Sequence, residues 1–472
     1  MQQQESTARS DFHSLYAEKD RRMMLLGAAM VASLTPFTDT VYLPALGSVQ
    51  SDLKTTATLV AATVSIYMAS SAIGQLLCGP LTDYHGRIRV MFAAFSIYLG
   101  LTVGCAFAKD INSLLVLRSL QGLAVTGTIV PSQAVIADIF APEERGAASG
   151  LFFVPILVGP IIAPLIGGFL AEAFSWRATF VFLTVFGIFI AVVAYATLPE
   201  THPFYVAQRL NREEKVTKNP KNPSFIYVSP PLSLAPIWYP LKFLVESELA
   251  PYFLSIGTSF AGMFATLTVL PIYLSAPPLS LGSEMVGLCY LPVGFGMFFG
   301  SIVGGSAADL SAARFPNSPE GRMVYLLPAI WVTAAGLLGF GFALENARSL
   351  AAILIAHTIM GFAQAALMPS TLSFVSSCRP MASGAAGAAL MFLCFASAAV
   401  SISVSVAVAD ASGSIAYFFV LSGGTVALGA CITTAISLRR VVFSAPGTST
   451  SLDAVPQEEL TFELVVSGSL KD

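Results

Sequence analysis

Charged residues are scarce in this chain. Asp, Glu, Lys and Arg together make up 11% of its 472 residues, against about 25% in a typical soluble protein. Apolar residues make up 55%, so there is too little charge to cover a soluble surface of this size. The composition predicts a polytopic membrane protein. The net charge of −3 gives no indication of a nucleic-acid partner.

Cysteine and histidine are also sparse, with 6 and 4 copies. No Cys-x-x-Cys pair occurs, and all cysteines except Cys378 lie inside apolar runs, so we interpret them as small apolar residues. The chain has no His-Glu-x-x-His, Walker or Gly-x-Ser-x-Gly pattern. We therefore expect no enzyme activity, no metal site and no cofactor. Its polar start gives no indication of a cleaved signal peptide.

Long apolar runs, by contrast, are abundant. A helix needs about 20 mostly apolar residues to cross a bilayer, and lipid requires every backbone polar group to be bonded within the segment. Twelve runs meet this length: 22–46, 58–81, 89–108, 112–137, 148–170, 177–198, 250–275, 285–308, 323–344, 350–374, 383–409 and 415–437. The sequence predicts an all-α membrane protein with twelve transmembrane helices.

Lysine and arginine indicate the orientation. If both termini are cytoplasmic, most of the 24 basic residues lie on the inside, and only Lys54, Lys109, Arg177 and Arg348 lie outside. Arg118 remains within a span. Because basic residues favour cytoplasmic loops, we expect both termini to be cytoplasmic.

The same reasoning divides the chain into five parts. We expect an N-terminal cytoplasmic tail at 1–21, a six-helix bundle at 22–199, a Pro- and Lys-rich cytoplasmic linker at 200–249, a second six-helix bundle at 250–437 and a disordered cytoplasmic tail at 438–472. Within the linker, a segment at 237–245 is a candidate to lie on the membrane surface.

The two bundles share residues at corresponding positions. Gly79 and Asp83 recur as Gly305 and Asp309, and Pro131-Ser132 recurs as Pro369-Ser370. Each match alone is compatible with chance, but two together favour an internal duplication of the six-helix unit, as in transporters built from repeats.

A short polar segment, GPLTDYHGRIR, separates the second and third spans. Its glycines permit a tight turn and its arginines favour the cytoplasm. The spacing of Gly79, Asp83, Gly86, Arg87 and Arg89 resembles the signature loop of the major facilitator superfamily. A basic loop that only fixes topology is the alternative. Tyr84 and Ile88 stand where that family usually has basic residues, so the charge cluster is thinner here.

Further motifs resemble the twelve-helix drug:proton antiporter branch of that superfamily. They are Asp39-Thr-Val-Tyr-Leu-Pro44 in the first span, Arg118-x2-Gln121-Gly122 in the fourth, and Leu198-Pro-Glu-Thr201 after the sixth. The chain is similar to bacterial bicyclomycin-resistance and fungal quinidine-resistance exporters, closely over the first six spans and loosely over the last six.

The fifth span matches the antiporter motif of that branch. Its residues are Gly150, Gly159, Pro160, Ala163 in place of the usual glycine, Pro164, Gly167 and Gly168. Small residues let another helix approach closely and prolines bend the helix, which suits a joint between moving halves. Ordinary small-residue packing is the alternative.

Asp39 and Arg118 are the deepest charges in the predicted bundle. Opposite charges at one depth in apolar surroundings attract strongly, whereas each alone is costly. We expect the two side chains to pair, and protonation of Asp39 to loosen the pair and couple proton flow to opening. A static pair, or an Asp39 that reaches surface water, is the alternative.

The resemblance also implies a latch at the cytoplasmic side. It places Asp83 near the start of the 383–409 span, whose positive helix end would favour the carboxylate. It pairs Arg87 with Asp138 at the inner end of the 112–137 span. A solvated helix end is the alternative for Asp138.

Other polar residues inside the spans are weaker candidates. Gln75, Gln121, Gln133 and Gln364 are candidates to line a cavity or to bond between helices. His357 can titrate near neutral pH, but a lone histidine is more often a packing residue.

The resemblance implies a proton-coupled exporter of small organic molecules that works by alternating access. A carrier or exporter of one defined metabolite, such as an organic acid, a polyamine or a secondary metabolite, is the alternative within transport, and a non-transporting sensor lies outside it. The expected partners are a small-molecule substrate, protons and the lipid bilayer. We expect a monomer in the plasma membrane, with the vacuolar membrane as the alternative.

Overall fold

The computed structural model describes residues 16–140, 144–209, 238–315, 319–346, 349–379 and 383–443. Residues 1–15 and 444–472 of the expected tails and residues 210–237 of the expected linker lie outside these ranges. Residues 438–443, expected to be part of a disordered tail, instead continue a helix that ends at Phe443.

The first half is built from seven α-helices and one short 3₁₀ segment in the described residues. In chain order they are α2 (Glu18–Thr40), η1 (Leu43–Ala45), α3 (Leu46–Asp52), α4 (Ala57–His85), α5 (Arg87–Ala106), α6 (Ile111–Ile139), α7 (Arg145–Ala173) and α8 (Arg177–Thr197).

The second half repeats this pattern after the 3₁₀ segment η2 (Tyr239–Leu244). Its elements are α10 (Ala250–Ser275), α11 (Ser283–Leu288), α12 (Tyr290–Arg314), η3 (Pro319–Leu326), α13 (Leu327–Asn346), α14 (Leu350–Cys378), α15 (Ser383–Ser412) and α16 (Ile415–Phe443). Twelve of the described helices or continuous helical stretches are long and apolar enough to cross a membrane, which confirms the predicted twelve spans.

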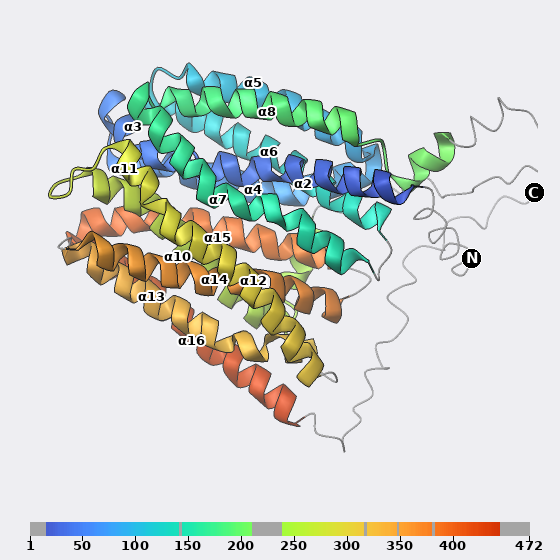
Figure 1. Cartoon of the computed structure of the whole chain (residues 1–472). Coiled ribbons are helices and arrows are strands. Elements are labelled where there is room, and N and C mark those ends of the chain that lie inside the picture. Colours follow the sequence, from blue (N-terminus) through green and yellow to red (C-terminus); the bar gives the residue numbers. More distant parts are fainter. Residues whose placement is uncertain are drawn as a thin grey trace, which may run out of the picture.

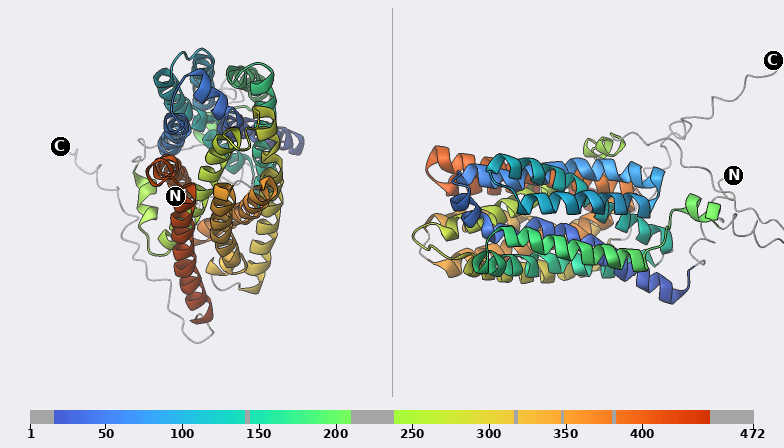
Figure 2. Two further views of the ribbon diagram at one scale, coloured as in Figure 1. Left: turned by 90° about the vertical axis from the view of Figure 1, so that its left-hand side faces the viewer. Right: turned by 90° about the horizontal axis from the view of Figure 1, so that it is seen from above.

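The two halves form separate bundles that lie side by side (Figure 1). Helices α2 to α8, in blue to green, pack above α10 to α16, in yellow to red, and the view turned by 90° about the vertical axis shows the same division (Figure 2, left). The halves meet along two seams, where α4 packs on α15 and α7 packs on α11 and α12. Small residues permit close helix contact in lipid, and Gly168 of α7 lies at the second seam.

Hydrogen bonds between the halves, among the described residues, lie in the outer part of these seams. Thr58 of α4 donates to Asp410 of α15 over 2.7 Å, and Ser403 donates to Ser65 over 2.9 Å along the same pair of helices. In the other seam, the backbone N–H of Ser283 donates to the Glu172 carboxylate over 2.8 Å. The outer side of the molecule is therefore closed in this structure.

Several helices are longer than the sequence indicates. The first span, expected to end at residue 46, continues through η1 and α3 to Asp52, and α4 continues past residue 81 to His85. Pro44 marks the transition, because it lies in η1, where its missing N–H interrupts the regular helix. The polar end of α4 remains helical up to His85. Gly86 ends the helix there, because its φ of 93° is a backbone conformation that residues with a side chain rarely adopt.

Candidate functional site

Arg118 lies at the centre of the first half. It is fully buried, with 0% of its surface exposed. Its Nη1 donates to the Gln121 side-chain oxygen over 2.8 Å, and Gln121 in turn donates to the Thr102 hydroxyl over 2.8 Å. Gln121 therefore positions the guanidinium and bonds α6 to α5, and it is as completely buried as Arg118.

Aromatic rings supply most of the remaining surroundings of Arg118. The Cζ atom lies 4.1 Å from the centroid of Tyr67, 5.2 Å from that of Tyr42 and 5.9 Å from that of Phe180. A cation over a ring face in a site without water gains about 2 kcal/mol or more. The rings thus offset part of the cost of burying this charge, but Nε and Nη2 have no hydrogen-bond partner.

Asp39 lies in the same buried layer, on α2, with 5% of its surface exposed. Its Oδ1 and the Tyr67 hydroxyl both lack a hydrogen-bond partner. No ion pair within 4 Å joins Asp39 to Arg118, so the predicted direct pair is wrong for this arrangement. The reason is the direction of the guanidinium, which Gln121 and the face of Tyr67 hold instead.

The other predicted glutamines differ in position. Gln75 and Gln364 are buried, whereas Gln133 is exposed. His357 is fully buried within the second half. None of these four side chains joins the cluster around Arg118.

The small residues of α7 pack as the motif predicts at four positions. A Cβ on Gly159 would meet Pro36 of α2 at 2.9 Å, and one on Gly167 would meet the Val41 carbonyl at 1.8 Å. Gly168 faces the other half, where a Cβ would lie 2.5 Å from the Ser283 carbonyl. Ala163 is fully buried. Proline side chains at 155, 160 and 164 lie within the same helix.

Gly150 is an exception. It is exposed, and a Cβ built there would have no heavy atom within 4 Å. The expectation that it belongs to the close-packing face is therefore wrong in this arrangement. It lies in the first part of α7, on the cytoplasmic side, where the described halves make no hydrogen bond to each other.

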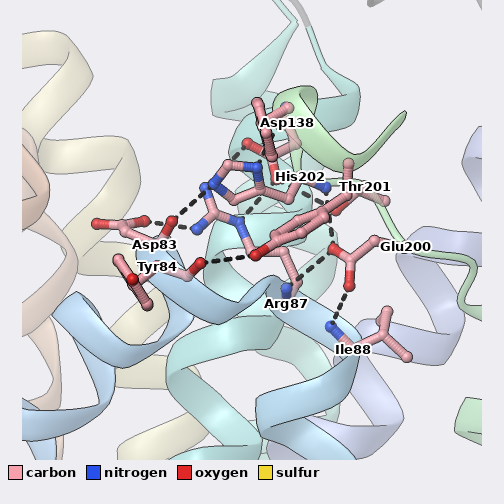
Figure 3. Close-up of polar contacts among 10 residues, drawn as sticks. Asp83, Tyr84, Arg87, Ile88, Asp138, Glu200, Thr201 and His202 are labelled. Carbon is pink, nitrogen blue, oxygen red and sulfur yellow. Dashed lines mark hydrogen bonds and ion pairs between the residues drawn. The ribbon is translucent and has the colours of Figure 1, made fainter. Parts of the chain in front are cut away.

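At the cytoplasmic side, Arg87 joins two acids (Figure 3). Its Nε donates to Asp138 at the end of α6 over 3.0 Å, and Nη1 bonds to Asp83 one turn earlier. Arg87 and Asp138 are both largely buried, with 10% and 12% of their side-chain surface exposed. This contact holds α4, α5 and α6 together within one half.

The segment that follows α8 completes this cluster. Glu200 accepts from the backbone N–H groups of Arg87 over 2.9 Å and Ile88 over 3.2 Å, at the start of α5 (Figure 3). Thr201 donates to Asp138 over 3.1 Å, and the His202 ring bonds to the Asp83 carbonyl over 2.8 Å. We call residues 200–202 the clasp.

The sequence identifies Glu200 and Thr201 only as part of a motif after the sixth span, and it does not single out His202. Their contact with the loop was not foreseen, because it depends on where the end of α8 lies relative to α5. The one signal in the sequence was Glu200, an acid just after the sixth span with no lysine or arginine beside it. A carboxylate that accepts N–H groups at a helix start is a strong helix cap.

Replacing Glu200 by alanine is expected to destabilise the first half. Two N–H groups of α5 and that of His202, which also donates to Glu200 over 3.0 Å, would lose their acceptor. The expected cost is about 1–3 kcal/mol. A lower thermal unfolding midpoint of the purified protein in detergent checks this. Asp309→Ala, at an exposed acid of α12, is the matched control, and an equal midpoint in both variants would contradict the cap.

The clasp also predicts a pH dependence. Burial, together with the nearby Arg87 charge, lowers the pKa of His202 below its usual value. The folded state then binds the proton less well than the unfolded state, so stability is fully present above about pH 6.5 and falls as the pH drops through the lowered folded pKa. His202→Gln is expected to reduce the loss of thermal midpoint on acidification. An identical loss in the variant and the parent protein would reject this.

The predicted contact of Asp83 with the start of α15 is not formed among the described residues. Asp83 instead pairs with Arg87, and 71% of its side-chain surface is exposed. Gly79 and its counterpart Gly305 have no heavy atom within 4 Å of a built Cβ, and Asp309 is exposed. The physical reason is the closed outer side: the hydrogen bonds between the halves lie at the opposite end.

Arg89 contacts the clasp side of the first half. Its guanidinium lies 4.9 Å from the Tyr205 ring, and Tyr205 donates to the Tyr84 carbonyl over 2.9 Å. The helical segment at 203–209 is thereby fixed to the signature loop.

Two packed bundles of six spans, with a buried charge in the first and close-packed glycines at the seam, define a polytopic membrane transporter. The model of the Major Facilitator Superfamily matches residues 28–402. The chain belongs to this superfamily.

Known proteins agree with this assignment. The MFS-type transporter mpsC of Macrophomina phaseolina is 31% identical over 67% of this chain and 65% of its own length. The efflux pump radE of Floropilus chiversii is 28% identical over 67% of this chain and 61% of its own. The chain thus spans less than two thirds of the length of these two relatives.

A solved structure shares the fold. It is a bacterial homologue of the human lysosomal transporter Spinster, with a TM-score of 0.61 and 14% identity, and the match covers 91% of this chain and 99% of that one. The structural likeness supports the twelve-helix architecture.

Proposed function

We propose that this protein is a proton-coupled exporter of small organic molecules, which exchanges substrate for protons by alternating access. The observation that carries the proposal is the buried layer of Asp39 and Arg118. A carboxylate with a free oxygen and a guanidinium with two free nitrogens are costly inside a membrane protein. The burial of these unpaired atoms is explained if a proton or a polar group of the substrate binds to them during transport.

Export as the direction of transport is supported by the antiporter motif in α7 and by the similarity to an efflux pump. The close contacts of Gly159, Gly167 and Gly168 place α7 against both α2 and the second half. A helix face with few side chains at this seam permits the two halves to rotate against each other while they stay packed closely enough to exclude ions. Energy comes from the proton gradient, without a bound cofactor.

Alternating access is supported by the distribution of contacts between the halves. The structure has the outer side closed through Thr58, Ser65, Glu172 and their partners. In the opposite state the outer bonds would break, and Asp83 and Gly79 would approach the start of α15. This exchange of one set of contacts for another is what a two-state carrier requires.

A transport screen tests the function. Liposomes that contain the purified protein are loaded with chemically varied compounds, and counterflow is measured with and without an imposed pH gradient. The proposal expects saturable flux of amphipathic organic compounds that increases with the gradient. Binding without flux would reject transport, and flux that does not respond to the gradient would reject coupling.

We place this transporter in the plasma membrane as a monomer.

A further inference from the structure

The 3₁₀ segment η2 and the two residues that flank it have an apolar surface that the rest of the described protein does not cover. Residues 238–245 read WYPLKFLV, in which Lys242 is the only charged residue. Trp238 has 71% of its surface exposed and Val245 has 82%. Eight residues are too few to cross a bilayer, and contiguous exposed apolar side chains mark an interaction surface. The exposed face of this segment therefore needs a partner.

The geometry of η2 sorts its side chains by a period of three, since residues three apart lie above one another in a 3₁₀ helix. Pro240 and Phe243 are buried, and η2 packs mainly on α15, with further contacts to α10. Tyr239, Lys242 and Val245 have the same spacing and are all exposed. The segment is thus fixed to the second half by one face and presents another face outward.

The segment η2 lies on the side of the bundle, toward the cytoplasmic end of the spans. Seen from above, it lies outside the outline of the neighbouring helices (Figure 2, right). The chain continues from η2 into α10, which is one of the membrane spans. Leu244 lies only six positions before Ala250, the first residue of that span. This places η2 at the level where lipid headgroups meet the acyl chains.

Ion pairs that follow η2 mark the boundary with the cytoplasm. Arg379, directly after α14, bonds to Glu246 over 3.1 Å and to Glu248 over 2.9 Å. All three side chains are partly exposed, and charged groups are costly within hydrocarbon. The chain after Val245 therefore lies in the aqueous layer, and the apolar residues before it lie toward the lipid.

The residue types of the exposed face suit the headgroup layer. Tryptophan and tyrosine combine an apolar ring with a polar N–H or O–H and are enriched at this level of membrane proteins. The Lys242 ammonium lies 4.2 Å from the centre of the Tyr239 ring and 5.1 Å from that of Phe243, and it forms no ion pair with a described residue. Its charge is free to bind a lipid phosphate while its stem covers apolar surface.

We propose that residues 238–245 form a membrane-surface anchor, in which the rings of Trp238 and Tyr239 lie in the headgroup layer of the cytoplasmic leaflet. The partner is phospholipid, because the exposed face lies beside α15 and next to the start of α10, and both helices are membrane spans. Such a segment lies about 5–10 Å into the boundary between headgroups and acyl chains. The anchor holds the start of the second half at a fixed depth and does not depend on the proposed proton coupling.

Tryptophan fluorescence measures this depth, because the chain has only 3 tryptophans. The double variant Trp176→Phe, Trp331→Phe retains Trp238 alone. The full chain with these two changes is reconstituted in liposomes that contain phospholipid brominated either near the headgroup or near the end of the acyl chain. Acrylamide in the water is the third quencher, and the loss of emission is compared among the three.

Trp238 is expected to lose more emission to bromine near the headgroup than to bromine near the chain end, and little to acrylamide. Its depth should fall within about 5–10 Å of the headgroup boundary. Trp331 is the matched control, since it is 41% exposed near the middle of the span Glu320–Asn346. In the variant Trp176→Phe, Trp238→Phe, which retains Trp331 alone, bromine near the chain end should quench more strongly.

Three results would overturn the anchor. Quenching of Trp238 by acrylamide without quenching by bromine would place the ring in water. Quenching by none of the three would show that protein covers it, either residues 210–237 or a second copy of the chain. Stronger quenching by bromine near the chain end would place it in the hydrocarbon core.

A difference measurement covers the case in which the double variant does not fold. The emission of Trp238→Phe is subtracted from that of the parent protein under each quencher, and the difference belongs to Trp238. This single variant should fold, because the side chain is 71% exposed and phenylalanine keeps an apolar ring. The same three results would overturn the anchor.

Discussion

The Asp39→Asn variant is expected to fold normally and to lose export driven by a pH gradient. Asparagine has nearly the shape of aspartate, and Oδ1 has no hydrogen-bond partner to lose in the closed-outer structure. The amide cannot bind and release a proton in the physiological range, so the substrate can still exchange across the membrane but cannot be driven uphill. Uptake into inside-out vesicles should fall to the level of empty liposomes, while counterflow persists.

Asp309→Asn is the matched control for this experiment. It makes the same chemical change at an exposed position of α12, and it should export like the parent protein. Full gradient-driven export by Asp39→Asn would contradict the account, whereas loss of counterflow together with a lower thermal midpoint would show that Asp39 acts in folding instead.

The Gly167→Val variant is expected to have the largest effect on stability. A Cβ at this position would lie 1.8 Å from the Val41 carbonyl oxygen of the first span. Backbone atoms cannot move aside as a flexible side chain can, so α7 would have to separate from it. Overpacking of this kind costs about 1–3 kcal/mol and occasionally more, and since the obstacle here is backbone the purified protein should show a strongly lowered unfolding midpoint and little transport.

Gly150→Val separates packing from the nature of the substitution. It introduces the same side chain into the same helix at a position with no heavy atom within 4 Å. It should leave the thermal midpoint close to that of the parent. Equal losses in both variants would show that valine disturbs α7 by helix propensity, and not by contact with α2.

Much of the fold could be predicted from the sequence, because length and hydropathy alone define a span in lipid. The twelve helices and the division into two halves follow from that constraint. The ends of the helices were less certain: the continuation of the first span to Asp52 depends on η1, whose short turn has no counterpart in hydropathy.

The identity of the buried charges could also be predicted, since an aspartate and an arginine in apolar runs are conspicuous. Their geometry could not. Whether Arg118 bonds to Asp39 or to Gln121 depends on the direction of one long side chain among three rings, and spacing along a helix does not specify it. Sequence reasoning missed Glu200 for a related reason, because its contact with Arg87 joins positions far apart in the chain.

The predicted latch at Asp83 illustrates a further limit. The sequence is compatible with both states of a carrier, and the resemblance described contacts of the state in which the inner side is closed. The structure has the outer side closed, with Glu172 and Asp410 bonded across the seams. A motif can therefore identify a gate without specifying whether it is shut.

Proton movement coupled to substrate movement tests the central claim most directly. A pH-sensitive dye is trapped in proteoliposomes with a substrate identified by the counterflow screen, and lumenal pH is recorded as the substrate leaves. The account predicts acidification of the lumen that depends on substrate in the parent protein and is absent in Asp39→Asn. Substrate efflux without acidification, or equal acidification in the variant, would contradict it.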